Sequence, residues 1–404
     1  MRRIEMKSST KFLRSIAILV GIFILALIGD LAFTSPVNAY DFGDADSLYI
    51  ADEGGVPNSS PAPNSTVKRF SAETGASLGT FVNAGSAPFN CNNLTVPPSS
   101  CSDPDKIIEP NGINGLFWYE GKLFLADQNA NVNPNGEILE YLHTGAFLEE
   151  LVPYTSSPVS APHGIVLSQD RKNLYAADEN TPGFVAIFDA VTGAFNGHLD
   201  FSGLPGDPGQ YFPRGLVFGP DGLLYVSVFN QADLTAGWIL RFDPITGNLV
   251  GNGVFASTST CSDLHRPDGL TFGPDRKLYV TSFQADTTDT DKILIFDIFG
   301  NLTDKIILDP DVTYGGPRAY AQAILFGPDE RLFVPIYNTG EVRSYFKDND
   351  DETWYSHENG AWKFYPFIRS GGSLIQPKFL TFGRTDPSTL QYCGDRDWCG
   401  DQNH

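Results

Sequence analysis

Polar side chains recur at one position of a repeated Pro-x-Gly motif, and their types are those that bind ligands or transfer protons. Histidine and aspartate act as acids and bases, and arginine and lysine stabilise negative charge. Ordinary core packing does not select such residues at equivalent places in apolar strands. Aligned on the Phe-Gly-Pro-Asp segment that follows, the position holds His163, Arg214, Asp268, Gln322 and Lys378. The irregular segment Pro110–Gly115 supplies Asn111 or Asn114.

If these side chains converge in a concavity, they predict a binding or active site. The alternative is a water-filled channel, where polar groups solvate strand ends or form ion pairs, such as Asp268 with Arg214 or Lys378. His163 is a weak signal for a general base, because the sequence identifies no partner that orients its ring.

The elements that position these residues follow from a second repeat, a Leu followed by an aromatic residue. The spacings between successive pairs are 75, 51, 50, 54 and 54 residues, so one unit of about fifty residues recurs. The pairs are Leu48-Tyr49, Leu123-Phe124, Leu174-Tyr175, Leu224-Tyr225, Leu278-Tyr279 and Leu332-Phe333. Alternating apolar runs separated by Gly, Pro and Asp turns predict four antiparallel strands per unit. Such sheets bury both faces only by packing radially, so the sequence predicts an all-β, six-bladed β-propeller.

The ends of the chain predict how the ring closes. Residues 46–52 begin at what is the second strand of a unit, and the segment Gln376–Gly383 forms an unaccompanied first strand. Pairing of the two would complete one mixed blade. The alternative is a seventh blade, because the segment Thr389–Tyr392 weakly resembles the segment around a Leu-aromatic pair.

A second set of polar residues follows the Leu-aromatic pairs, which we call anchors. The pattern Leu-Tyr-x-x-Asp places Asp52, Asp127 and Asp178 at strand ends, and amides follow two positions later in most units. Asn and Asp bond nearby backbone groups in turns. We expect this structural role. Two acidic loops, 286–291 and 348–352, lack the spacing of a calcium loop, and we expect them to be solvated.

The N-terminus predicts export. Basic residues precede an apolar stretch from Ile16 to Phe33 and a small-residue end at Ala39, as in a secretory signal peptide spanning residues 1–39. An uncleaved anchor is the alternative, since 18 apolar residues just span a bilayer. Cleavage removes five basic and two acidic side chains and changes the net charge from −21 to −24. Such an acidic surface excludes nucleic-acid binding. We expect a periplasmic or secreted protein, no longer associated with the membrane, that forms one domain over residues 40–404.

Five cysteines in an exported chain predict disulfides. Cys91 and Cys101 bracket a Pro/Asn/Ser-rich segment within the insertion 84–108, and Cys393 and Cys399 lie in the C-terminal tail 385–404. These two local pairs are the preferred pairing, which leaves Cys261 as a free, buried thiol. A bridge between Cys101 and Cys261 is the alternative, because both precede similar Ser-Asp sequences.

The segment Arg266–Val280 resembles the Pro-Asp-Gly-Leu to Leu-Tyr-Val signature of the six-bladed superfamily that contains NHL-repeat proteins, SMP-30/gluconolactonase enzymes and virginiamycin B lyase. The resemblance covers nearly all of residues 40–390. In the lactonases the Asp of this motif binds a divalent metal, usually Ca²⁺, which implies Asp268 as a metal ligand. Arg214 stands where that family has an Asn ligand, and a cation there repels Ca²⁺. The lyase branch uses a metal and His residues, and His163 is the match.

The sequence therefore predicts an exported propeller that binds a small organic ligand in its central funnel. If the protein is a metal-assisted enzyme, we expect Arg214 or Lys378 to stabilise developing negative charge and His163 or Asp268 to transfer a proton. As a non-catalytic module, loops on the channel face would bind a protein partner. The chain also resembles NHL-type proteins associated with exported, scytonemin-like aromatic pigments, which implies a tailoring enzyme. The H-E-x-x-H, P-loop and C-x-x-C motifs are absent from the sequence.

Overall fold

The computed structural model describes residues 47–54, 65–83, 110, 112–128, 135–180, 183–201, 204, 210–308, 318–345 and 364–393. All of them belong to the compact unit Asp41–His404. The predicted signal peptide and the insertion 84–108 lie outside these residues. Within the described part, no helix is long and apolar enough to cross a membrane.

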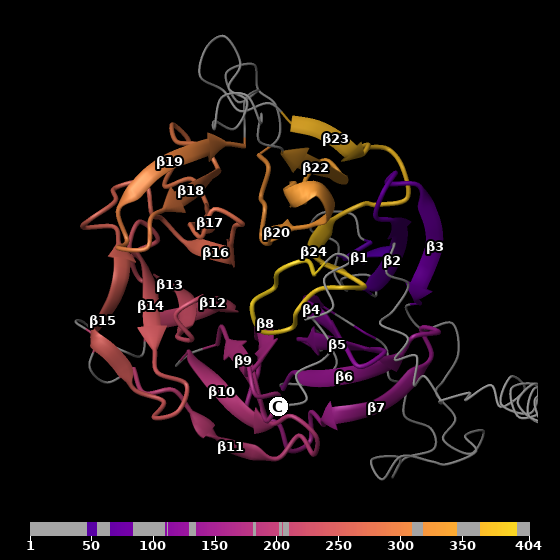
Figure 1. Cartoon of the computed structure of the whole chain (residues 1–404), viewed down its shortest axis with the longest axis horizontal. Helices are drawn as coiled ribbons and strands as arrows, with labels where there is room; N and C mark the ends of the chain where they lie inside the picture. The colour runs from indigo at the N-terminus through magenta and orange to yellow at the C-terminus, as the bar shows by residue number, and fades with distance from the viewer. Residues whose placement is uncertain are drawn as a thin grey trace, which may run out of the picture. The chain divides into compact units, whose positions relative to one another are not determined.

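Six four-stranded antiparallel sheets form a ring around a central channel, which confirms the six-bladed propeller (Figure 1). The strands of each blade follow one another outward from the axis. Blade 1 contains β24 (Pro377–Phe382), β1 (Ser47–Asp52), β2 (Thr66–Ser71) and β3 (Ser77–Val82). Blade 2 contains β4 (Ile113–Tyr119), β5 (Lys122–Asp127), β6 (Glu137–Leu142) and β7 (Phe147–Val152). Blade 3 contains β8 (Pro162–Leu167), β9 (Asn173–Asp178), β10 (Phe184–Asp189) and β11 (Phe195–His198).

The second half of the ring repeats the same order. Blade 4 contains β12 (Tyr211–Phe218), β13 (Leu224–Asn230), β14 (Gly237–Phe242) and β15 (Leu249–Ser257). Blade 5 contains β16 (Pro267–Phe272), β17 (Leu278–Ser282), β18 (Lys292–Phe296) and β19 (Leu302–Ile307). Blade 6 contains β20 (Leu325–Phe326), β21 (Leu332–Ile336), β22 (Glu341–Tyr345) and β23 (Phe364–Ile368), with the 3-10 turn η4 (Pro328–Glu330) after β20.

The two ends of the chain close the ring as predicted. Strand β24 pairs antiparallel with β1, so that Leu48 lies opposite Phe382 and Asp52 lies opposite Pro377. The alternative of a seventh blade is wrong. In the described part of the C-terminal segment, Thr385 and Tyr392 form an isolated bridge rather than a strand of another sheet. A hairpin-like turn at this point satisfies the local backbone without extending any blade.

The Leu-aromatic repeat forms the seams between blades. The aromatic ring of the anchor in one blade packs against the aromatic ring at the end of the next blade's inner strand. Most of these contacts are edge to face. Tyr225 and Phe272 have ring centroids 5.1 Å apart at 81°, and Tyr279 and Phe326 lie 5.0 Å apart at 79°. Such pairs contribute about 0.5–1.5 kcal/mol beyond their buried area. The same contact joins Tyr49 to Trp118, Tyr175 to Phe218 and Phe333 to Phe382.

The glycine of the Pro-x-Gly motif allows the inner strands to approach one another closely. A Cβ on Gly164 would lie 2.5 Å from the carbonyl oxygen of Arg214, and one on Gly215 would lie 2.4 Å from that of Asp268. Atoms cannot approach that closely without a backbone shift. The motif therefore sets the narrow radius of the channel, and the central residue of each motif becomes a neighbour of the central residue in the next blade.

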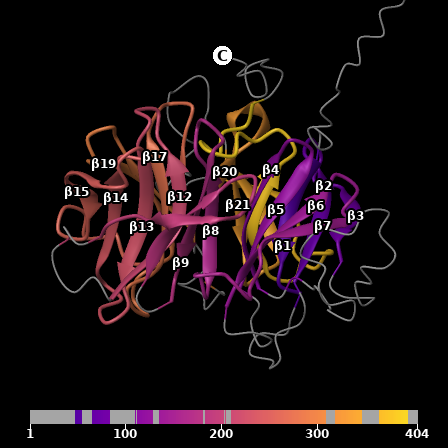
Figure 2. The same ribbon diagram turned by 90° about the horizontal axis from the view of Figure 1, so that it is seen from below.

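The C-terminal segment Thr385–Cys393 closes one end of the channel (Figures 1 and 2). The backbone N–H groups of Leu167 and Phe218, at the ends of two inner strands, donate to the carbonyl oxygens of Pro387 at 3.0 Å and Ser388 at 2.9 Å. Leu390 packs against apolar clusters from around the ring. The channel is therefore a funnel with one opening.

Two of the five cysteines lie in the described part. Cys261 is free and buried, as predicted, so the alternative bridge to Cys101 is wrong. Burial raises the pKa of its thiol, which keeps the group protonated and unreactive. Cys393 is buried with 2% of its surface exposed. The pairs Cys91–Cys101 and Cys393–Cys399 stay predictions, because three of these four residues lie outside the described part.

Candidate functional site

A β-bulge in the inner strands presents the central residue of each Pro-x-Gly motif to the channel. The pairing register of β12 shifts between Pro213 and Leu216, and that of β16 shifts between Pro267 and Leu270. A bulge leaves a residue unpaired in the ladder and changes the direction of its side chain. Ser227 satisfies the buried backbone groups at the bulge, because its Oγ accepts from Gly215 N at 2.7 Å and donates to the carbonyl of Asp268 at 2.5 Å.

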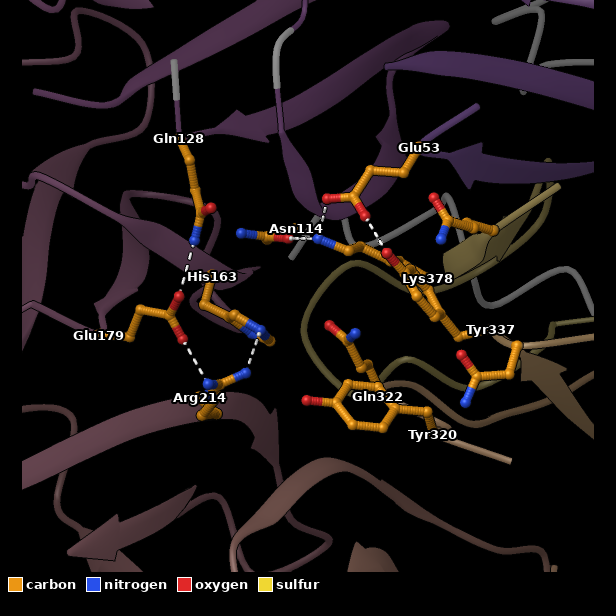
Figure 3. Close-up of a pocket in the computed structure, with 12 residues that line it drawn as sticks. Glu53, Asn114, Gln128, His163, Glu179, Arg214, Tyr320, Gln322, Tyr337 and Lys378 are labelled. Carbon is orange, nitrogen blue, oxygen red and sulfur yellow. Dashed lines mark hydrogen bonds and ion pairs between the residues drawn. The ribbon is translucent and has the colours of Figure 1, made fainter. Parts of the chain in front are cut away.

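The open end of the funnel forms a pocket of about 480 Å³ (Figure 3). Five of the residues singled out from the sequence line it: Asn114, His163, Arg214, Gln322 and Lys378. Asp268 lies behind this lining with 1% of its surface exposed and contacts both Arg214 and His163. Asn114 occupies the position equivalent to His163 in its blade, whereas Asn111 lies outside the described residues.

Sequence reasoning missed a second ring of side chains around the same pocket. Each member comes five positions after the Leu of an anchor, directly beyond the second strand: Glu53, Gln128, Glu179 and Tyr337. The equivalent residues of blades 4 and 5 are Phe229 and Phe283. The signal was present, because three of these residues follow the Asp of Leu-aromatic-x-x-Asp. That Asp itself has the predicted turn role, since Asp178 accepts hydrogen bonds from the backbone of Ser160 and Ala161.

Arg214 connects the two rings on one side of the pocket. Its Nη2 lies 2.8 Å from Oε2 of Glu179, and its Nη1 donates to Oδ2 of Asp268 at 3.2 Å. Gln128 donates to the second oxygen of Glu179 at 2.8 Å, and the guanidinium lies over the ring of Phe229. Arg214 is therefore held by two carboxylates and an aromatic face, each from a different blade.

His163 and Asp268 lie close together as a buried pair beside Arg214. Nη1 of Arg214 lies 3.1 Å from Nε2 of His163, and because a guanidinium only donates, Nδ1 carries the ring proton. Nδ1 lies 3.7 Å from Oδ1 of Asp268, and neither atom has a hydrogen-bond partner within the described part. Burial, then the charges of Arg214 and Lys378, lowers the pKa of His163 well below its usual value. Burial raises the pKa of Asp268 to about 7, against the attraction of Arg214.

Lys378 forms the centre of a second cluster on the opposite side of the pocket (Figure 3). Its ammonium group forms an ion pair with Glu53 and donates to Oδ1 of Asn114 at 3.1 Å. The hydroxyl of Tyr337 donates to the other oxygen of Glu53 at 2.5 Å. Burial and this carboxylate raise the pKa of Tyr337. The pocket thus contains two paired cations, two paired carboxylates and several amides.

The residues around Asp268 do not fit a divalent metal ion. Arg214 occupies the carboxylate from the channel side, and Lys378 adds a second positive charge nearby. In the part of the chain that the structure describes, no three His, Cys, Asp or Glu side chains are arranged to hold a metal ion. Titration with Ca²⁺ tests the role as a metal ligand that the resemblance implies for Asp268.

No family model matches the chain, and no curated protein matches its sequence. Solved structures do resemble its fold. A chain of a nidogen/laminin complex is 14% identical with a TM-score of 0.50, and the match covers 83% of this chain and 97% of that chain. A periplasmic gluconolactonase of Pseudomonas aeruginosa is 13% identical with a TM-score of 0.47, covering 83% and 99%. A catalytically inactive virginiamycin B lyase from Staphylococcus aureus, solved with quinupristin, is 16% identical with a TM-score of 0.44, covering 83% and 88%. At these identities the likeness concerns the fold alone.

Proposed function

We propose that this protein is an exported β-propeller whose funnel binds a small organic molecule rich in hydroxyl groups. The observation that carries the proposal is the convergence of polar side chains from around the ring in one pocket, while Pro387 and Ser388 close the far end of the channel. Each cation of the pocket is already paired with a carboxylate. A neutral hydroxylated ligand both donates to Glu53 or Glu179 and accepts from the neighbouring cations and amides, so it leaves the charge balance unchanged.

The geometry favours recognition over chemistry. Asp268, whose pKa is raised to about 7, is buried behind Arg214 and outside the pocket lining, and its neighbour His163 lines the pocket with only 1% of its surface exposed. An enzyme of lactonase, lyase or pigment-tailoring type is the second candidate. The observation that favours it is the raised pKa of Asp268, because a group with a pKa near the working pH is suited to acid–base catalysis. A protein-binding role for the channel-face loops is the third.

Ligand-observed NMR with mature protein, residues 40–404, tests the binding function. Glucose, glucono-1,5-lactone and 4-hydroxybenzyl alcohol serve as hydroxylated probes. We expect saturable binding that Gln322→Ala weakens about tenfold, since the partner of a lost hydrogen bond is left unsatisfied. Gln391→Ala, at the closed end of the channel, is the matched control. If none of the probes binds, or if the control variant has the same effect, the funnel is not the binding site.

A catalytic assay separates the first two candidates. Lactone hydrolysis is followed with the native chain and with Asp268→Asn, which retains the size of the side chain but not its proton exchange. Turnover that Asp268→Asn abolishes would establish the enzyme. Binding without turnover in either chain supports the recognition function.

A further inference from the structure

Two arginines beside the pocket are held on a stacked pair of aromatic rings. Phe283 and Tyr320 stack with centroids 4.8 Å apart at 23°, and Tyr320 lines the pocket. The guanidinium of Arg266 lies 5.7 Å from the Phe283 ring, and that of Arg318 lies 5.0 Å from the Tyr320 ring. Cation–π contacts of this kind hold a guanidinium in place while its donor edge stays available.

The backbone at this place is strained in a way that the repeat does not explain. Arg266 has φ of +38° and Tyr320 has φ of +52°, and both immediately precede the inner-strand motif of their blades. Non-glycine residues adopt this region at a cost of about 1–3 kcal/mol, and such strain concentrates at functional sites. The other non-glycine cases belong to the turn after the inner strand or to the closing segment: Glu120, Arg171, Arg276, Glu330 and Leu390.

A buried carboxylate positions the whole group. Asp291 is 1% exposed, forms an ion pair with Arg318 at 2.5 Å and accepts from the backbone N–H groups of Tyr320 at 2.8 Å and Gln284 at 2.9 Å. The carbonyl oxygen of Gln284 in turn accepts from Nη2 of Arg266 at 2.6 Å. One acid therefore fixes both arginines and the ring between them, which is the support that a preorganised site requires.

Arg266 keeps most of its hydrogen-bonding capacity unused. A guanidinium has five donors, and within the described residues Arg266 spends one on Gln284 and has no carboxylate at ion-pair distance. After burial, the nearby positive charges of Arg318 and Arg214 lower its pKa. A protein of net charge −21 thus gathers three arginines at one rim of its funnel. Arginines at such a site recognise planar oxyanions through paired hydrogen bonds.

We propose that Arg266, with Arg318 beside it, forms a subsite for an oxyanion, a carboxylate or a phosphate, carried by the ligand of the funnel. This inference rests on the proposed function and makes it narrower: the ligand has a hydroxylated part that lies in the pocket and an anionic group that lies on the rim. Arg214 stays paired with Glu179 and Asp268 and takes no part in holding the anion.

The test uses mature protein labelled with ¹⁵N-arginine and follows the side-chain Nε–H signals. The probes are sodium benzoate and inorganic phosphate at constant ionic strength, with benzyl alcohol as the uncharged counterpart. We expect the Arg266 signal, assigned by its loss in Arg266→Gln, to shift saturably with benzoate or phosphate and not with benzyl alcohol. In Arg266→Gln, the remaining shift of Arg318 requires at least tenfold more anion. Arg266→Lys, which retains the charge without the planar fork, gives the same weakening if the Gln variant folds poorly.

Arg241 is the matched control, because its guanidinium lies 5.5 Å from the ring of Phe255 and its Nε is likewise buried without a hydrogen-bond partner in the described part. Equal shifts of Arg241 and Arg266 would mean an adventitious ion only and would overturn the subsite. No shift of Arg266, or the same shift with benzyl alcohol, would overturn it as well. If the hydroxylated probes still bind and Gln322→Ala still weakens them, the proposed binding function holds and only the anionic group of the ligand is refuted.

Discussion

Replacing Asp268 by Asn tests whether a buried acid holds a proton behind the pocket. Asn retains the size of the side chain and an oxygen that accepts from Arg214, but it cannot ionise. The carboxyl of Asp268 has a pKa of about 7 in the folded protein, against 3.8 for an unperturbed aspartate in an unfolded chain. Between these values the folded state binds more protons than the unfolded state. The contribution of Asp268 to stability therefore falls as the pH rises from about 4 to about 7 and is constant above that.

The magnitude follows from the size of the shift. About three pKa units at about 1.4 kcal/mol each amount to roughly 4 kcal/mol that ionised Asp268 costs the folded state above neutrality. The mature chain of about 365 residues has an unfolding entropy of roughly 0.8 kcal/mol/K, so the expected change in the melting midpoint is about 5 °C. The lowered pKa of His163 acts in the opposite sense below about pH 6.5, and His163 is present in both chains.

Differential scanning calorimetry of both chains from pH 5 to pH 8 measures the effect. The midpoint of Asp268→Asn minus that of the native chain is expected to rise by about 3.5 °C across this range, because only about two of the three pKa units, or about 2.7 kcal/mol, lie above pH 5. Asp189→Asn is the control, because hydrogen bonds from Thr192 lower the pKa of exposed Asp189 and it stays ionised throughout. A pH-independent difference would show that Arg214 keeps Asp268 ionised, and the reasoning about the proton would be wrong.

Three further outcomes test the structure. Gly215→Ala lowers the midpoint by several degrees because its Cβ would lie 2.4 Å from the Asp268 carbonyl, whereas Gly372→Ala, with 3.4 Å to its nearest atom, changes little; equal shifts would contradict the close approach. Leu390→Ala costs about 2 kcal/mol of packing and speeds proteolysis of the closing segment; an unchanged cleavage rate would argue against the closed end. Millimolar Ca²⁺ leaves the midpoint unchanged, while a rise that Asp268→Ala abolishes would establish the metal site.

The fold could be predicted because each blade repeats the same local pattern. The anchor Leu and aromatic are buried in every unit, as Leu224 and Tyr225 illustrate, and the Phe of Phe-Gly-Pro-Asp is the partner of an anchor ring one blade away. Repetition makes register visible in the sequence, since the same burial requirement selects the same residue types. Ring closure could also be predicted from the repeat, because the strands of one unit are divided between the two ends of the chain.

The site was only half predictable. The first ring follows from the Pro-x-Gly register, but Glu179 stands in a segment where acidic residues usually make turns, so its type carried no separate signal. The carboxylate partners of Arg214 come from the blades on either side of it: Glu179 lies 35 residues before it in the sequence (214 − 179) and Asp268 lies 54 residues after it. No local sequence pattern predicts that the guanidinium of Arg214 contacts two carboxylates and an imidazole. That arrangement exists because closely packed inner strands bring neighbouring motifs together.

The second ring is chemically unlike on its two sides, and for the ligand that we propose this difference predicts one orientation. Blades 1 to 3 contribute Glu53, Gln128 and Glu179, whereas the same position in blades 4 to 6 holds Phe229, Phe283 and Tyr337. Phe229 and Phe283 are buried behind the pocket lining, where their rings contact the guanidinium groups of Arg214 and Arg266. A molecule with a hydroxylated end and a planar or anionic end satisfies both halves only when its hydroxyl groups face blades 1 to 3. In that orientation its centre lies between Arg214 and Lys378, the two cations that the carboxylates of the first half already neutralise.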